Sequence, residues 1–170
     1  MRSARRRRTV QARVVDGKLR VSIPAAMSAT EEHHWVEEMV RRLSRRAATD
    51  EIDLTERAEA LGRRHRLPAP ASIRWVDNQQ ARWGSCTPAD GTVRISARLA
   101  AFPPWVLDYV IVHELAHLVE VGHGPAFKAL ERRFSRAERA IGFLMAKGLD
   151  GDEVRRPPTP REGALPLPGI

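Results

Sequence analysis

The sequence has a single cysteine, Cys86, so it cannot form an internal disulfide bond. It has no apolar run of the roughly 18 residues that a transmembrane helix needs, because the nearest stretch, 104–121, includes Asp108 and other polar side chains. The arginines near the N-terminus are not followed by a hydrophobic segment, so no secretory signal is expected. These absences favour a protein of the reducing cytoplasm that does not insert into membranes.

The net charge of +8 comes almost entirely from the N-terminal end. Residues 1–20 contain eight basic side chains and one acidic side chain, and the other 150 residues have a net charge of only +1. The run of Arg5, Arg6, Arg7 and Arg8 could contact nucleic-acid phosphates weakly, or could simply keep this end of the chain solvated, which is the simpler interpretation. We expect residues 1–8 to form a basic disordered arm.

A chain of 170 residues suits one domain with one hydrophobic core. We expect this domain to span residues 9–150, with a monomer as the default oligomeric state. Residues 151–170 contain five prolines and few large apolar side chains. This composition is typical of a disordered tail.

The N-terminal half of the domain predicts a β-hairpin followed by two helices. Apolar and polar residues alternate on both sides of Asp16-Gly17, a dipeptide typical of two-residue hairpin turns. Ser28 and Glu31 have the spacing of a capping box, and the apolar positions after them predict a helix over about 28–47. A second helix is expected from Asp53, its N-cap, to a point before Pro68.

The C-terminal half predicts strands and then helices. Short alternating segments between 72 and 96, with a turn at 88–91, predict a small antiparallel sheet. Three further helices are expected: one opened by Pro104, one after Pro125, and one that ends near Gly148. The predicted fold class is therefore α+β.

The most informative segment is HELAH at 113–117. Residues four apart lie roughly 40° from each other around an α-helix, so His113 and His117 present their imidazoles on one face. Glu114 projects roughly 100° further round, where it can hold a water molecule beside a metal ion. This is the pattern of an H-E-x-x-H zinc helix, and only about 0.02 chance matches are expected in a chain of this composition.

A third ligand is expected from His123. Gly122 can adopt a positive φ, which would end the helix and turn His123 back toward the metal. Pro125 is well placed to begin the next helix, so His123 would lie in the connection. Three histidines leave one coordination position open for water, which distinguishes a catalytic zinc site from a structural one.

Two motifs together resemble the YgjP-like (WLM-related) metallopeptidase family, over roughly residues 10–148. They are RWGSC at 82–86 with the strand that ends in ISARL at 95–99, and DYVIVHELAHL at 108–118 with His123 and Phe127. The resemblance implies a minimal zincin-like fold, in which a small sheet packs on helices with zinc (Zn2+) in the cleft. It also implies that His113, His117 and His123 are the zinc ligands and that Glu114 is the catalytic glutamate.

The expected reaction is hydrolysis of a peptide bond, with zinc activating a water molecule and Glu114 acting as general base. Tyr109, one turn before His113, or Arg82 could stabilise the oxyanion, although packing and an ion pair are their simpler roles. Glu120, one turn after His117, could accept a hydrogen bond from an imidazole.

The segment 82–86 could border the cleft and bind an extended peptide by strand addition. Gly84 would then allow close backbone approach, although a structural glycine in a tight bend is the alternative. Trp83 is interpreted as core or as cleft wall. Cys86 is interpreted as a small buried side chain rather than a metal ligand.

Two other functions stay open at this point. Members of the resembled family have been assigned as nucleotide phosphohydrolases, but the sequence has no Gly-rich phosphate loop and no carboxylate cluster for magnesium. A nucleic-acid-associated module that binds through Arg5, Arg6, Arg7 and Arg8 is the other.

Overall fold

The computed structural model describes residues 2–3, 10–15, 18–79 and 81–149 of the chain. These residues form an α+β structure, as expected, with two three-stranded sheets. The predicted tail, 151–170, and most of the predicted arm lie outside the described residues. In chain order the elements are β1 (Arg2–Ser3), β2 (Gln11–Val15), β3 (Lys18–Pro24), α1 (Ala29–Asp50), α2 (Leu54–His65), β4 (Ser72–Val76), β5 (Gly84–Thr87), β6 (Thr92–Ser96), the 3-10 helix η1 (Ala97–Ala101), α3 (Pro104–His117), α4 (Pro125–Glu131) and α5 (Ala137–Leu149).

The predicted N-terminal hairpin forms, with Val15 opposite Lys18 as a two-residue connection requires. Strands β2 and β3 are antiparallel, with Ala12 opposite Val21, and the turn residues Asp16 and Gly17 lie outside the described part. Strand β1 pairs with β3 in parallel, with Arg2 opposite Ile23. Two residues of the arm that we expected to be disordered therefore belong to a sheet.

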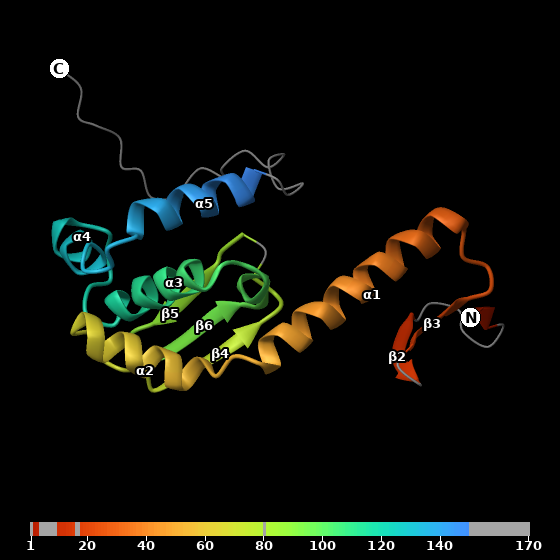
Figure 1. Cartoon of the computed structure of the whole chain (residues 1–170), viewed down its shortest axis with the longest axis horizontal. Coiled ribbons are helices and arrows are strands. Elements are labelled where there is room, and N and C mark those ends of the chain that lie inside the picture. Colours follow the sequence, from red (N-terminus) through yellow and green to blue (C-terminus); the bar gives the residue numbers. More distant parts are fainter. Residues whose placement is uncertain (1, 4–9, 16–17, 80, 150–170) are drawn as a thin grey trace, which may run out of the picture.

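Helix α1 begins at the predicted capping box. The Ser28 hydroxyl accepts a hydrogen bond from the Glu31 amide at 3.2 Å, and the Glu31 carboxylate accepts one from the Ser28 amide at 2.9 Å. No α1 side chain is buried, and Trp35 is 38% exposed. Figure 1 shows α1 leading away from the rest of the molecule, with β2 and β3 near its far end.

The second sheet is mixed, which corrects the expected antiparallel arrangement. Its strand order is β4-β6-β5, with β5 antiparallel and β4 parallel to the central strand β6. The chain crosses from one edge of the sheet to the other between β4 and β5, so β4 ends up in the same direction as β6. Alternation of apolar residues reveals strands but not their direction.

Helix α3 is the centre of the hydrophobic core. It contacts β5 and β6 as well as α2, α4 and α5, and nine of its 14 residues are buried. Figure 1 shows α3 between the sheet and α5. Although α3 is apolar, no helix in the described part of the chain has the length and apolarity needed to cross a bilayer.

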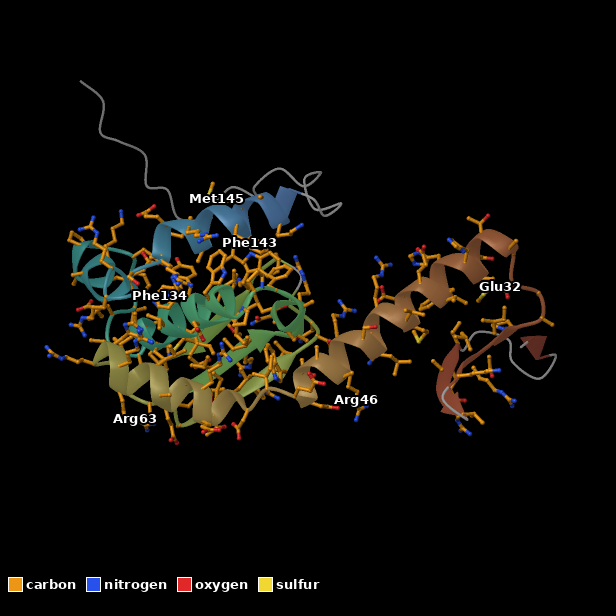
Figure 2. The ribbon with its side chains drawn as sticks, viewed as in Figure 1. Glu32, Arg46, Arg63, Phe134, Phe143 and Met145 are labelled. Carbon is orange, nitrogen blue, oxygen red and sulfur yellow. The ribbon has the colours of Figure 1, made fainter. Side chains whose placement is uncertain are left out.

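Helix α2 supports α3 from the side. Its predicted N-cap is confirmed, because Asp53 Oδ1 accepts hydrogen bonds from the amides of Thr55 and Glu56. Arg57 Nε donates to Asp108 Oδ1 at 2.6 Å, which ties α2 to α3. Figure 2 shows the side chains that fill the space between the helices and the sheet.

Candidate active site

Three histidine side chains come together at the C-terminal end of α3. His113 and His117 project from the helix, and His123 lies in the connection before α4, as predicted. One ring nitrogen of each lies within 4.8 Å of the others. The Nε2 atoms of His113 and His123 are 3.3 Å apart. Two imidazole nitrogens bonded to one tetrahedral zinc ion at about 2.0–2.1 Å would be separated by about 3.3–3.4 Å.

The connection is built differently from the prediction. Helix α3 ends at His117, and the carbonyl of Ala116 accepts hydrogen bonds from the amides of Val119 and Glu120 at 3.0 and 2.9 Å. Gly122 does not have a positive φ; among the described glycines only Gly91 does. The chain therefore turns directly after α3, and the prediction of a positive φ at Gly122 is wrong.

The other ring nitrogens of the two helix histidines already have partners. His113 Nδ1 lies 2.9 Å from Glu131 Oε1, and His117 Nδ1 lies 3.0 Å from the carbonyl oxygen of Glu120. When Nδ1–H donates to these acceptors, the Nε2 lone pairs are free for a metal. Burial, opposed by these hydrogen bonds, lowers the pKa of both histidines, which favours the neutral form that binds metals.

Two sequence expectations change with these contacts. Glu120 does serve His117, but through its backbone carbonyl rather than its carboxylate. The Tyr109 hydroxyl donates to Glu131 Oε1 at 2.6 Å, so its hydrogen atom is already used in this contact. Burial and then the Glu131 carboxylate raise the pKa of Tyr109, which keeps the hydroxyl protonated as a donor.

Glu131 is the residue of this site that sequence reasoning missed. It accepts from both Tyr109 and His113 at the end of α4. Burial alone would raise its pKa, but the two hydrogen bonds lower it below the usual range, so the carboxylate stays ionised. The one available signal was its spacing: Glu131 follows Phe127 by four residues, so both lie on the same face of α4.

Phe127 supports the histidines from one side. Its side chain is 1% exposed, and its ring centroid lies 4.9, 4.4 and 4.7 Å from those of His113, His117 and His123. The rings are therefore held by packing as well as by hydrogen bonds. A fixed set of three imidazoles needs little further ordering to bind an ion.

Glu114 is buried against the first residue of β5. Its side chain is 5% exposed, and burial raises its pKa to about 7, while the charge of Arg82 acts in the opposite direction. A Cβ atom on Gly84 would lie 2.5 Å from Glu114 Oε1. The close approach that we expected at Gly84 is thus made by the Glu114 side chain.

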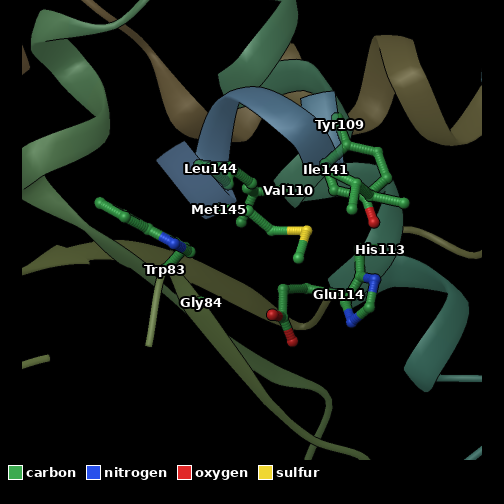
Figure 3. Close-up of a pocket in the computed structure, with 9 residues that line it drawn as sticks. All are labelled: Trp83, Gly84, Tyr109, Val110, His113, Glu114, Ile141, Leu144 and Met145. Atoms are coloured by element: carbon green, nitrogen blue, oxygen red, sulfur yellow. The ribbon is translucent and has the colours of Figure 1, made fainter. Parts of the chain in front are cut away.

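Two cavities of about 340 Å³ each meet at Glu114. The first contains the three histidines and Arg82, together with Cys86. Cys86 is only partly buried and lines this cavity, rather than being fully buried as expected, and it is not part of the histidine group. Partial burial raises the pKa of its thiol to about 11, so the thiol stays protonated. The second cavity has Trp83 as a wall and is otherwise mostly apolar (Figure 3).

Comparison with known proteins identifies the family of the chain. The family model described as the YgjP-like metallopeptidase domain matches residues 8–138. The chain belongs to this family of metallopeptidase domains, which confirms the resemblance seen in its motifs.

Two solved structures are similar, and both are metallopeptidase zymogens. Abylysin of Pyrococcus abyssi is 18% identical, with a TM-score of 0.49 over 54% of this chain and 91% of that one. Jannalysin of Methanocaldococcus jannaschii is 19% identical, with a TM-score of 0.49 over 56% of this chain and 97% of that one. The search of curated proteins found no match.

Substituting Gly84 tests the contact with Glu114. We expect Gly84→Ala to lower the free energy of unfolding by about 1–3 kcal/mol, because the new methyl group overlaps the carboxylate. Urea denaturation followed by circular dichroism measures the change. Gly122→Ala is the matched control, because a Cβ there meets no atom within 4 Å and the backbone φ is not positive.

The origin of the loss can be checked with a double variant. If the overlap is with Glu114, Gly84→Ala should lower the free energy of unfolding much less in a Glu114→Ala background than in the wild-type protein. Equal losses in Gly84→Ala and Gly122→Ala would show that the packing between Gly84 and Glu114 is not as described.

Proposed function

We propose that the protein is a zinc-dependent peptidase in which His113, His117 and His123 hold the ion and Glu114 is the catalytic base. The observation that carries the proposal is the convergence of three imidazoles beside a buried carboxylate. Membership of a metallopeptidase family supports the same reaction class. Three neutral imidazole donors suit zinc better than magnesium or calcium, which prefer oxygen ligands.

A bound zinc ion would supply Lewis acidity, which polarises a scissile carbonyl and makes a water molecule easier to deprotonate. The chain itself fixes the ligands. Glu131 and the Glu120 carbonyl hold the rings of His113 and His117 in one orientation, and Phe127 packs against all three rings.

Glu114 moves the proton in this proposal. A carboxylate with a pKa of about 7 can accept a proton from the attacking water and return it to the leaving amine at neutral pH. Gly84 lets the carboxylate lie against β5, where it lines both cavities. No covalent intermediate with the protein is needed.

Arg82 is the better of the two proposed oxyanion stabilisers. It lines the cavity that contains the three histidines, and its guanidinium offers several hydrogen-bond donors. Tyr109 is already committed to Glu131. A guanidinium in the same cavity as the histidines can stabilise negative charge that develops on the substrate oxygen.

We propose that the peptide lies along β5. This strand is at the edge of its sheet and pairs only with β6 among the described strands. Its first residue, Gly84, touches the catalytic carboxylate, so a peptide added at this edge would pass beside Glu114. Strand addition supplies backbone hydrogen bonds that are independent of substrate sequence.

The alternatives have less support. Among the described residues, the three histidines are the only group of three or more metal-ligating side chains, so no carboxylate cluster for magnesium accompanies them. This arrangement does not favour a nucleotide phosphohydrolase, whose phosphates usually need such a cation. Arg5, Arg6, Arg7 and Arg8 lie outside the described residues, and nucleic-acid binding through them stays a prediction.

Replacement of Glu114 tests the proposed chemistry. Zinc-loaded wild-type protein should cleave casein and unstructured peptides, and a chelator should abolish this activity until zinc is restored. We expect Glu114→Gln to lower kcat by about 100-fold or more, with one zinc per chain still bound by metal analysis. Glu59→Gln, a half-exposed carboxylate on α2, serves as the control.

The same preparations should be assayed with nucleoside triphosphates. Triphosphate cleavage that requires Glu114, in a protein that cleaves no peptide, would replace the peptidase proposal with the phosphohydrolase. Peptide cleavage that is unchanged in Glu114→Gln would remove Glu114 from the proposed role.

Glu131→Gln tests the support of the metal ligands. The amide cannot accept charge-assisted hydrogen bonds from His113 and Tyr109, so zinc affinity should fall by about 10–100-fold. Competition with a chromophoric chelator measures the affinity, again with Glu59→Gln as control. An unchanged affinity would mean that Glu131 stabilises the fold without supporting the ligand.

A further inference from the structure

The mostly apolar cavity beside Glu114 has no role in the proposed reaction so far. It has a volume of about 340 Å³ and shares Gly84, His113 and Glu114 with the histidine-containing cavity. Its remaining lining residues come from the position just before β5, from α3 and from α5. They are Trp83, Tyr109, Val110, Ile141, Leu144 and Met145.

We propose that this cavity, which we call the side-chain pocket, receives a large apolar side chain of the substrate next to the scissile bond. The protein would then prefer peptides with an aromatic or large aliphatic residue at that position. The inference rests on the proposed peptidase function, because it defines the pocket relative to Glu114. The volume lies within the range of about 300–1,000 Å³ that is usual for ligand pockets.

The polarity of the pocket supports an apolar occupant. Among the described residues that line it, only Glu114 and His113 can carry charge, and both stand where the two cavities meet. The Tyr109 hydroxyl is bound to Glu131. A charged substrate side chain would lose its hydration there and gain no partner in the apolar part, which is unfavourable.

One wall of the pocket is an aromatic ring held in place by other side chains. The guanidinium carbon of Arg98 lies 4.0 Å from the Trp83 ring centroid, and the Phe102 centroid lies 5.3 Å from it. Neither Arg98 nor Phe102 lines the pocket, so both support the ring from other sides. A fixed tryptophan gives a substrate side chain a large apolar contact at little entropic cost.

Helix α5 supplies the opposite, more adaptable wall. Leu144 is buried, whereas Met145 is 67% exposed and its thioether projects into the space between Trp83 and Glu114 (Figure 3). A methionine side chain can change its shape to fit different apolar groups. Because Met145 is exposed, its replacement should not disturb the hydrophobic core. Met145 is therefore the lining residue best suited to altering the preference for apolar substrate side chains.

The first experiment varies one substrate residue. Zinc-loaded full-length protein is given two series of unstructured peptides. In one series the residue before the cleaved bond varies, and in the other the residue after it varies. The varied residue is Ala, Leu, Phe, Lys or Asp. We expect kcat/KM for the Leu and Phe peptides to exceed that for the Ala peptide by about 10-fold or more in one series. The Asp and Lys peptides should have kcat/KM values no higher than that of the Ala peptide. Equal values in both series would overturn the inference.

The second experiment changes the pocket. Met145→Glu places a carboxylate at the pocket, so kcat/KM for the Phe peptide should fall by about 10-fold or more, and Lys should become preferred over Asp. Ala146→Glu adds the same charge at the next exposed position of α5, which does not line the pocket, and should leave the preference unchanged. An unchanged preference in Met145→Glu, or the same change in both variants, would refute the role of Met145.

A binding measurement separates this inference from the peptidase proposal. Calorimetric titration of the Glu114→Gln variant with the same peptides should show the Phe peptide binding about 10-fold more tightly than the Asp peptide. If wild-type protein cleaves no peptide but this difference is found, the peptidase proposal fails, and the pocket remains only as a binding site for apolar side chains. If peptides are cleaved and bound without an apolar preference, only the pocket fails.

Discussion

The burial of α3 is the constraint on which the rest of the site depends. Because the helix is enclosed by the sheet and by α2, α4 and α5, its polar side chains must find partners inside the protein. His113 pairs with the Glu131 carboxylate, and His117 pairs with the carbonyl of Glu120. The contacts that make burial tolerable are thus the ones that orient the imidazoles toward His123.

Local spacing explains why much of the site could be predicted from the sequence. His113, Glu114 and His117 have fixed positions on any α-helix, and the capping residues Ser28 and Asp53 act on amides within three residues. These features need no knowledge of tertiary structure. His123 was also placed correctly, because only five residues separate it from His117 at the end of α3.

Features that depend on distant segments could not be predicted in the same way. Glu131 is 18 residues from His113, and only the packing of α4 on α3 brings them together. The parallel pairing of β4 with β6 depends on the path between β4 and β5. The apolar stripe of α1 predicted a helix but not its environment, since Trp35 and Val40 stay exposed.

In the proposed mechanism, the position of Glu114 links the hydrolysis of a peptide bond to the choice of the residue beside that bond. Gly84, His113 and Glu114 are shared by a cavity with three histidines and by a mostly apolar cavity walled by Trp83. A Cβ on Gly84 would overlap the Glu114 carboxylate, so the glycine allows this carboxylate to lie against the edge of β5. A peptide along that edge would present its backbone to Glu114 and one neighbouring side chain to the apolar cavity. The single glycine contact would therefore set both where a chain is cut and which residue stands beside the cut.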